Sequence, residues 1–491
     1  MKKYLLPLLF LSLPLALVAQ QDPMSLYSDF YDGVKSISSI VWDDHTNIAT
    51  VKLDNENFEV TAVNDQLQKK WSSSFAGSVM TTERFKDKII VIAATEHSTV
   101  KGNGNTYVAY LIDPTNGKQL LQKEVYHGDD TYMEVPMIFT GDGSFVKICI
   151  RQTGFTRQMH VGLLGALSID KYTSQLNETR QLNAITLNDK LDAENNLKLP
   201  VPAGTVISMC ANIRGDIFIS WMNGQGIKVD KYADGSATPA KELNADVAFV
   251  ADDGMILAEQ LRMVASATNP DVIYYGTTYA NQDNDIELGV GKLDFTTGKK
   301  SFVTEAFDRN HVKALEKSFV AINKKTDDVD LGSRRGLHIR YLGEAGGILI
   351  ATVTSQYTET ASYGAWNVEN SVLVNGYDEN LGIRFQQILP ANYKIPNRFI
   401  PIAYHHTQNK FYVIGNEKTG INTVTGIYGC LDLASGKWEK MQALSKKHIS
   451  SFGFANGYAT MWFGNSFAVS YFSTKGFNNT SFNVALQQNE Y

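Results

Sequence analysis

The chain has 491 residues, of which 43% are hydrophobic, 11% aromatic and 20% charged, and its formal net charge is −6. This composition excludes a disordered chain, which lacks the apolar residues needed to build a core. It also excludes the basic surface of a nucleic-acid-binding protein, because no cluster of Lys and Arg exceeds a few residues. The 23 Tyr and 24 Phe residues favour β-strands.

The N-terminus predicts a secretory signal peptide over residues 1–19. Lys2 and Lys3 precede an apolar run over residues 4–19, and a polar stretch follows, which is the order of segments in such peptides. The run is short and contains two prolines, so an uncleaved membrane anchor is the weaker alternative. We expect cleavage after Ala19 and export to the periplasm or the extracellular space. The sequence has no Cys near the expected cleavage point, so we expect no lipid anchor. No later apolar run is long enough to span a bilayer.

One motif recurs along the chain: an apolar strand ends in Asp, turns through Gly and leaves through Lys. The clearest copies occupy residues 111–118, 292–299 and 430–437. The Asp carboxylate accepts backbone N–H groups two residues further on, and Gly supplies the positive φ that closes a hairpin. We therefore interpret the motif as structural rather than catalytic. The predicted turn residues are Asp65, Asp113, Gly117, Asp170, Asp230, Asp294, Gly298, Asp378, Asp432 and Gly436.

The spacing of these Asp residues predicts a β-propeller, an all-β fold. They return roughly every 50 to 60 residues over most of the chain, which is the length of a blade built from four short strands. Seven Asp-marked units and a tail unit predict eight four-stranded antiparallel blades in one domain over residues 24–491. We expect the tail to supply four strands, at 449–454, 458–463, 467–472 and 481–486. A seven-bladed ring is the alternative, in which the two termini share one blade.

A short inserted helix is expected at about residues 308–325, in the interval between the fifth and sixth units. Asp308 is a suitable N-cap. Apolar residues then recur at spacings of three and four, which makes one apolar helical face, formed by Val312, Leu315, Phe319 and Ile322. We expect the helix to pack on one rim of the propeller; a role as a lid or docking element is the alternative.

The recurring motif resembles the blade repeat of the quinoprotein-like, or PQQ-repeat-like, propellers. The strongest matches are residues 112–119, 293–300 and 431–438, and residues 64–71 resemble a variant in which a polar residue replaces the Gly. The signal peptide and composition are also similar to those of exported propellers from uncharacterised families common in Bacteroidota. The resemblance implies the propeller fold. It leaves two functional classes open, because the superfamily contains dehydrogenases that use pyrroloquinoline quinone and calcium, and non-catalytic scaffolds such as the outer-membrane assembly lipoprotein.

The cofactor-binding features of these enzymes have no match in this sequence. There is no adjacent pair of Cys to stack on a quinone, and six Trp residues are too few for a regular series of tryptophan docking motifs. We therefore predict no cofactor. Structural calcium is a weaker alternative, because calcium prefers several oxygen ligands and acidic turns supply them. These turns are Asp43-Asp44, Asp129-Asp130, Asp252-Asp253 and residues 281–285.

The three Cys residues are predicted to be buried free thiols. Cys149 and Cys210 lie in apolar runs, where a thiol behaves as a small hydrophobic side chain. No spacing between Cys430 and the other Cys or His residues suggests zinc. A Cys149–Cys210 disulfide is the alternative that an exported protein permits.

A basic patch in the sixth unit is a candidate ligand site. Arg334, His338 and Arg340 lie on a segment that we place as the innermost strand of this unit. Alternation along a strand would put these three side chains on one face, where they would suit an anionic ligand. The simpler interpretation is a solvated or salt-bridged strand.

Three further residues are candidates for a ligand-binding rim. Tyr363 and Trp366 lie in a long polar stretch, and aromatic residues there would stack on sugars or peptides, or pack on the next blade. His405 precedes a second His at the end of a strand. Adjacent residues of a strand point to opposite faces, so these two histidines are not expected to chelate one metal ion.

The function favoured by these features is that of an exported, non-catalytic propeller that serves as a binding or scaffold module for a protein or glycan partner. Propellers place function in the loops at their rims or in the central channel. The alternative is a divergent propeller enzyme, either a quinoprotein-like oxidoreductase or a glycan-active hydrolase or lyase. The sequence shows no GxSxG, HExxH or Walker motif to support that alternative.

Overall fold

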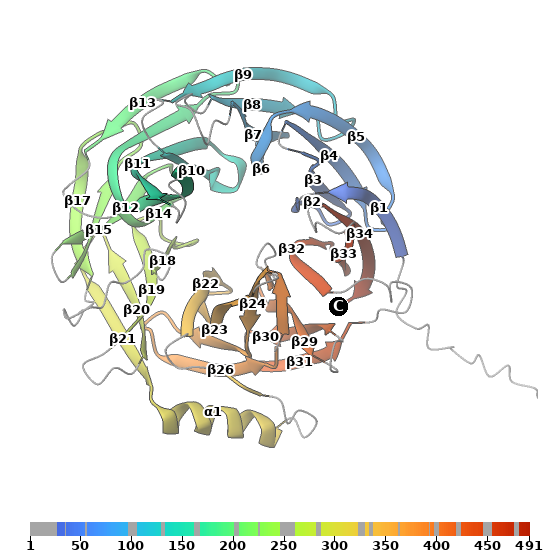
Figure 1. Cartoon of the computed structure of the whole chain (residues 1–491). Helices are drawn as coiled ribbons and strands as arrows, with labels where there is room; N and C mark the ends of the chain where they lie inside the picture. Colours follow the sequence, from blue (N-terminus) through green and yellow to red (C-terminus); the bar gives the residue numbers. More distant parts are fainter. Residues whose placement is uncertain are drawn as a thin grey trace, which may run out of the picture.

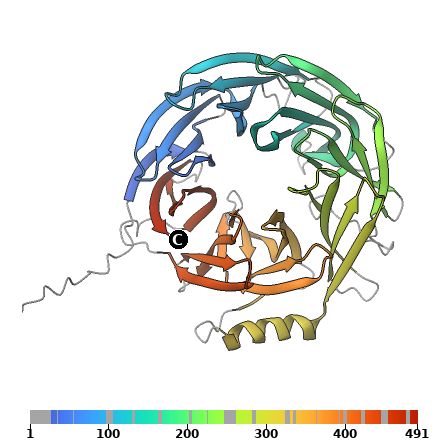
Figure 2. The same ribbon diagram turned by 180° about the vertical axis from the view of Figure 1, so that it is seen from behind.

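The computed structural model describes residues 27–34, 36–54, 56–96, 106–128, 133–161, 167–200, 206–223, 226–245, 261–280, 286–322, 329–332, 337–361, 364–391, 393–396, 402–418, 424–444, 454–475 and 481–491. The strands form eight antiparallel sheets arranged in a ring (Figures 1 and 2). The prediction of an eight-bladed propeller built from four-stranded antiparallel blades is therefore confirmed. Residues 1–19, the predicted signal peptide, lie outside the described residues. Within those residues, no helix has the length and apolar character that a membrane span requires.

Blades 1 to 4 follow one another along the chain, each running from an innermost to an outermost strand (Figure 1). Blade 1 contains β2 (Ser36–Asp43), β3 (Thr46–Lys52), β4 (Asn57–Asn64) and β5 (Lys69–Ala76). Blade 2 contains β6 (Ser78–Phe85), β7 (Lys88–Glu96), β8 (Thr106–Ile112) and β9 (Gln119–His127). Blade 3 contains β10 (Met133–Phe139), β11 (Val146–Val161), β12 (Leu167–Leu187) and β13 (Ala193–Leu199). Blade 4 contains β14 (Val206–Ala211), β15 (Ile217–Asn223), β16 (Gly226–Tyr232) and β17 (Pro239–Ala245).

Blades 5 to 7 keep the same plan, with one elaboration in blade 6. Blade 5 contains β18 (Leu261–Ala265), β19 (Val272–Ala280), β20 (Ile286–Asp294) and β21 (Lys300–Phe307). Blade 6 contains β22 (Leu337–Ala345), β23 (Ile348–Ala361), β25 (Val372–Tyr377) and β26 (Ile383–Leu389). The long β23 also pairs with β24 (Gly364–Glu369), which pairs with β27 (Tyr393–Pro396). Blade 7 contains β28 (Ala403–His406), β29 (Lys410–Lys418), β30 (Val424–Asp432) and β31 (Lys437–Ala443).

Blade 8 closes the ring with strands from both ends of the chain. The C-terminal part contributes β32 (Phe454–Trp462), β33 (Ser466–Lys475) and β34 (Ser481–Glu490), and β1 (Tyr27–Val34) pairs with β34 as the outermost strand. Figure 1 shows blue β1 beside dark red β34. The expectation that the tail supplies all four strands is therefore wrong. The termini do share a blade, as the seven-bladed alternative assumed, yet the ring has eight.

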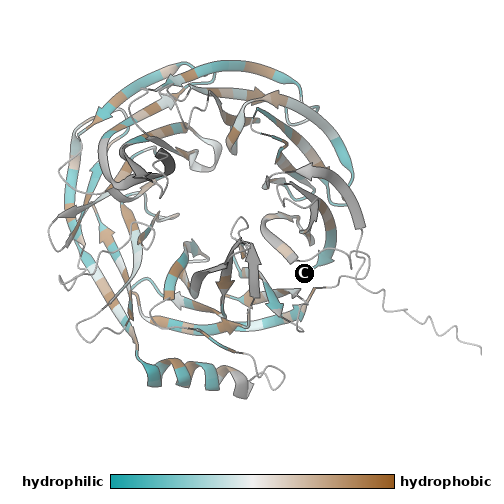
Figure 3. Cartoon of the chain, in the orientation of Figure 1, coloured by the Kyte–Doolittle hydropathy of each residue, from teal (hydrophilic) through white to brown (hydrophobic). Residues whose placement is uncertain are grey.

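Apolar layers between neighbouring blades hold the ring together. The layer between blades 8 and 1 is fully buried and includes Val51, Leu67, Met461, Phe472 and Leu486. On the outermost strands, exposed and less exposed side chains alternate, as in β17, because successive side chains of a strand point to opposite faces. Figure 3 shows apolar stretches along the strands and a mostly hydrophilic helix on the perimeter. All three cysteines, Cys149, Cys210 and Cys430, are buried and free, as predicted.

The Asp–Gly turns have the geometry that their chemistry implies. The Oδ1 atom of Asp113 accepts the backbone N–H of Thr115 at 2.8 Å, and Gly117 has a φ of 74°. Asp294 with Gly298, and Asp432 with Gly436, form equivalent turns. In each, the Gly N–H donates to the carbonyl of the Asp. Only a residue without a Cβ adopts such a φ at little cost.

Three of the predicted turn residues play other parts. Asp170 lies within β12, and the turn that follows this strand begins at Asn188. Asp230 lies within β16 with 3% exposure, and burial raises the pKa of its carboxyl. Asp65 lies in the turn after β4, but the carboxamide of Asn64 accepts the backbone N–H groups there. At Asp65 and Asp170 the motif fails because a second type of turn can begin with Asn instead of Asp, as at Asn64 and Asn188.

The second type of turn carries a buried Leu in a left-handed backbone conformation. In the turns at residues 64–68, 188–192 and 378–382, the first side chain accepts N–H groups from the third and fifth residues. The fourth residue is Leu67, Leu191 or Leu381, with φ of 58°, 58° and 66°. Each Leu is at most 4% exposed and belongs to an apolar layer between blades. A left-handed φ costs an L-residue about 1–2 kcal/mol, so burial of the side chain must offset it.

This balance predicts an unusual order of stability for variants of Leu191. Leu191→Ala and Leu191→Gly are both expected to lose about 2–5 kcal/mol of unfolding free energy, because each leaves a cavity. The unfolding free energy of the Gly variant should equal that of the Ala variant or be higher by up to about 1 kcal/mol, because Gly tolerates positive φ. Leu187, buried in the strand before this turn, is the control: there the Ala variant should be the more stable. Urea unfolding followed by tryptophan fluorescence measures all four, and the same order at both positions would contradict the prediction.

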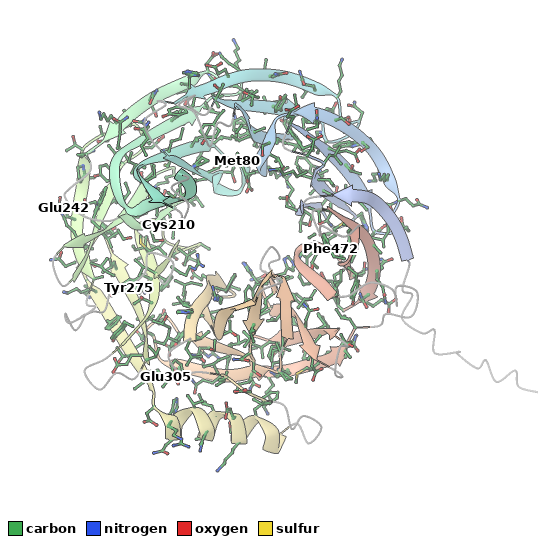
Figure 4. The ribbon with its side chains drawn as sticks, viewed as in Figure 1. Met80, Cys210, Glu242, Tyr275, Glu305 and Phe472 are labelled. Carbon is green, nitrogen blue, oxygen red and sulfur yellow. The ribbon has the colours of Figure 1, made fainter. Side chains whose placement is uncertain are left out.

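The inserted helix is α1 (Arg309–Ile322), and it lies on the outer perimeter rather than on a rim. Asp308 caps it by accepting the backbone N–H groups of Asn310 and His311 at 2.7 and 2.8 Å. Val312 and Phe319 are buried in the layer shared by blades 5 and 6. Glu305 of β21, labelled in Figure 4, joins the helix to blade 6 by accepting N–H groups from His311 and Gln386, each at 2.7 Å.

Candidate functional site

The sequence-predicted ligand residues are spread over separate elements. His338 and Arg340 lie half-buried on β22, and His405 lies on β28 of the next blade. A register shift in β22 between Ile339 and Tyr341 interrupts the alternation expected to align the basic patch. Trp366 lies on β24, opposite Glu359 of β23 in the strand register. Arg334 and Tyr363 lie outside the described residues.

His405 is part of an aromatic stack rather than an open rim. Its ring lies 4.7 Å from that of Trp462 and 5.8 Å from that of Tyr412, measured between centroids. The ring of Tyr491 lies 4.8 Å from that of Tyr412, and its hydroxyl donates to the carbonyl of Phe463 at 2.9 Å. Burial, with a smaller contribution from the neighbouring His406, lowers the pKa of His405 to about 4. The imidazole is therefore neutral at physiological pH.

This lowered pKa predicts that acid destabilises the stack. Because the folded-state pKa lies below the ordinary 6.5, the unfolded chain binds more protons between about pH 6.5 and pH 4. The contribution of neutral His405 to the unfolding free energy is fully present above the unfolded pKa, and it is lost as the pH falls through this window. His405→Phe keeps an aromatic ring but does not titrate. Between about pH 7 and 4.5, the wild type should lose about 1–2 kcal/mol more unfolding free energy than the variant.

Urea titrations at several pH values measure that difference. His45→Gln is the matched control. Hydrogen bonding to Asp65 raises the pKa of this exposed His, so removing it should change the pH dependence of stability in the opposite direction to His405→Phe. Equal pH dependence in the wild type and in His405→Phe would contradict the role assigned to this burial.

The innermost strand of blade 2, β6, carries an apolar side chain at the inner edge of the ring and a carboxyl with a shifted pKa. Met80 is 40% exposed, and Figure 4 shows it at the inner edge of the ring. Burial raises the pKa of Glu83, and Thr81 donates a hydrogen bond of 3.2 Å to its carboxyl. A single carboxyl with a raised pKa does not define a reaction.

A distinct pocket lies where blades 8 and 1 meet, and we call it the seam pocket. Its volume is about 260 Å³. Four segments form it: the turns after β2, β4 and β32, and the end of β34. The lining residues are Asp44, His45, Asp65, Gln66, Phe463, Asn465, Ser466, Gln488 and Glu490. None of these nine is Lys or Arg, so three acidic side chains face one pocket without a permanent cation.

The electrostatics of the pocket centre on one His–Asp pair. Nδ1 of His45 lies 2.6 Å from Oδ2 of Asp65. This hydrogen bond and the charge of Asp65 raise the pKa of His45, and the carboxylates of Asp43 and Asp44 contribute in the same direction. The imidazole is 75% exposed, so it can gain or lose its proton without unfolding of the turn.

Hydrogen bonds between the two blades hold the walls of the pocket. Gly464 donates its N–H to the carbonyl of Asp44 at 2.8 Å. Gln488 donates to the carbonyl of Asp65 and, at 2.9 Å, to the hydroxyl of Ser466. Phe463 is 4% exposed and belongs to the apolar layer beneath the pocket. The pocket is therefore a preformed feature of the ring closure.

The acidic residues of the seam do not converge on a metal site. Among the described residues, no group of three or more His, Cys, Asp or Glu side chains lies close enough together to hold a metal ion. Of the acidic turns considered for calcium, Asp43-Asp44 borders the seam pocket. The turns at Asp129-Asp130, Asp252-Asp253 and 281–285 lie outside the described residues, so structural calcium stays the weaker alternative there.

Sequence reasoning did not find the seam pocket as a unit. It singled out the acidic turn at Asp44 and the turn at Asp65, but for structural reasons. Nothing local marks Asn465 or Glu490 as their neighbours, because they lie 400 or more positions away in the chain. A periodic pattern signals blades and not the residues at the junction between the first and last blades.

Comparison with known proteins finds solved structures whose similarity to this chain is low. No family model matches the sequence, and no curated protein matches it. The WD40 domain of SCAP from fission yeast aligns over 95% of this chain and 98% of its own, with 8% identity and a TM-score of 0.42. A europium-containing methanol dehydrogenase aligns over 95% and 93%, with 9% identity and a TM-score of 0.40. The Dos1 propeller aligns over 80% and 79%, with 10% identity and a TM-score of 0.37. Similarities this low carry no argument about function.

Proposed function

We propose that this chain is an exported, non-catalytic β-propeller that binds a protein partner, and that the partner contacts the seam pocket. The observation that carries the proposal is the pocket itself: a preformed acidic cavity with hydrogen-bonded walls. Concave sites with a few polar groups around an apolar base are the usual form of a binding site. Loops at the ends of propeller strands are where such folds bind their ligands.

The lining residues favour a protein partner over a glycan. A glycan site typically offers the exposed face of an aromatic side chain, on which a sugar ring stacks. Of the nine residues that line the pocket, Phe463 is the one Phe, Tyr or Trp, and it is 4% exposed. The other eight are polar or acidic, and they suit hydrogen bonds to a side chain or backbone.

The proposal predicts contact between a partner and one defined position. Asn465 lines the pocket, and Leu120 is 46% exposed on β9 of blade 2. Asn465→p-benzoylphenylalanine, irradiated in the producing cells, should give a crosslinked adduct in the exported fraction. Leu120→p-benzoylphenylalanine is the matched control and should give none.

Mass spectrometry of the adduct identifies the partner, and Asp65→Asn introduced beside the photoreactive residue should reduce its yield. Two results would contradict the proposal: no adduct at Asn465, or the same adduct at both positions. Recovery of the protein only from the cytoplasm would contradict the export part of the proposal.

The His45–Asp65 pair favours one second candidate, a divergent propeller enzyme. A carboxylate that holds one nitrogen of an imidazole is the arrangement of a general base. If the pair is catalytic, the crosslinked partner or a small molecule bound with it should be chemically changed by the wild type. His45→Gln should abolish that change while leaving the adduct intact. Mass spectrometry before and after incubation distinguishes the two functions.

A further inference from the structure

We infer that the seam pocket binds the cationic side chain of an Arg or Lys residue from the partner. The inference rests on the proposed binding function and adds the chemistry of the group that is bound. Three features of the pocket lead to it: its charge, the separation of its acidic groups, and its size and apolar base.

The charge of the pocket selects a cation. Asp44, Asp65 and Glu490 are acidic, and the nine lining residues include no Lys or Arg to neutralise them. His45 pairs with Asp65, but it compensates the charge fully only when it is protonated. A guanidinium or ammonium group would form charge-assisted hydrogen bonds with these carboxylates, whereas an anionic ligand would be repelled.

The separation of the acidic groups favours an organic cation over a metal ion. A calcium ion needs several oxygen atoms at 2.3–2.6 Å from one centre, on the order of six or more. The acidic residues of the pocket come from three different segments, and in the described residues no such group converges for a metal. A guanidinium presents five N–H donors in a fork and reaches separate acceptors at once. The amide oxygens of Gln66 and Asn465 are further acceptors for those donors.

The size of the pocket suits one side chain. Drug-sized ligands occupy pockets of about 300–1,000 Å³, and the seam pocket, at about 260 Å³, is smaller. Phe463 supplies an apolar base, against which the methylene stem of Arg or Lys can pack while its charged end meets the carboxylates.

Occupation of the pocket would link the two ends of the ring. Asp44 and Asp65 belong to blade 1, whereas Phe463, Ser466 and Glu490 belong to blade 8. A cation that contacts both sets of residues must stabilise the closed ring over an opened one. Ligand binding is therefore expected to raise the unfolding temperature of the whole protein, which gives a readout that needs no knowledge of the partner.

The experiment uses two peptides that differ in one charge. Acetyl-Gly-Arg-Gly-amide and its citrulline counterpart have nearly the same shape, but citrulline is neutral. With the mature wild-type protein, we expect the arginine peptide to bind in calorimetry and to raise the unfolding temperature, and the citrulline peptide to do neither. Asp44→Asn should weaken binding of the arginine peptide about fivefold, and the double variant Asp44→Asn/Glu490→Gln should weaken it about 25-fold. Asp87→Asn, an exposed acidic residue in blade 2, is the control and should change nothing.

The protonation of His45 supplies a second readout. Because its pKa is raised by Asp65, it gains a positive charge as the pH falls through that raised value, and the pocket becomes less acidic. Binding of the arginine peptide should therefore be weaker at about pH 5.5 than at about pH 8. His45→Gln should flatten that difference. Circular dichroism of each variant verifies that the fold is intact.

Several results would overturn the inference. Equal binding of the citrulline peptide would show that charge is not recognised. Calcium that raises the unfolding temperature, while the arginine peptide does not, would show that the pocket is a metal site. An adduct at Asn465 without peptide binding would support the proposed binding function but contradict recognition of a cationic side chain. Absence of both the adduct and the peptide binding would contradict the proposed binding function as well.

Discussion

Pairing between the two ends of the chain is the interaction on which the rest of the structure depends. In a propeller the last blade meets the first, and no covalent bond joins the two ends of the chain there, so the ring stays closed only through non-covalent contacts. Here β1 supplies the outermost strand of blade 8 and pairs with β34. The apolar layer that contains Val51 and Phe472 lies between the same two blades. Ser39 donates to the carbonyl of Thr460 at 2.9 Å, and Asn47 to that of Trp462 at 2.6 Å.

Closure also explains why the candidate site lies where it does. Within a blade, turns are spaced regularly and their polar groups are satisfied by their own hairpins, as in the turn at Asp113. At the junction of blades 8 and 1, turns from two distant parts of the chain meet. Their acidic side chains face a shared pocket. The His45–Asp65 pair and the hydrogen bonds of Gln488 keep that pocket in shape.

The two types of turn show how one fold tolerates different local sequences. An Asp–Gly turn reaches the left-handed backbone conformation through a residue without a Cβ, whereas the turn at Leu191 reaches it with a large apolar side chain. The second solution is stable only because that side chain is buried between blades. A local rule for turns therefore fails at Leu67, Leu191 and Leu381, where a tertiary contact outweighs the backbone preference.

The sequence alone was sufficient to predict the all-β class, the eight units, the buried thiols and the capped helix at Asp308. These depend on strand and helix periodicity and on turn chemistry, which act between residues close in the chain. Tertiary structure alone decided which strand closes the ring, the stack of His405 on Trp462, and the seam pocket. The hydrogen bonds of that closure join residues 421 and 415 positions apart. No local pattern records such pairs, because what brings them together is the burial of apolar layers around the whole ring.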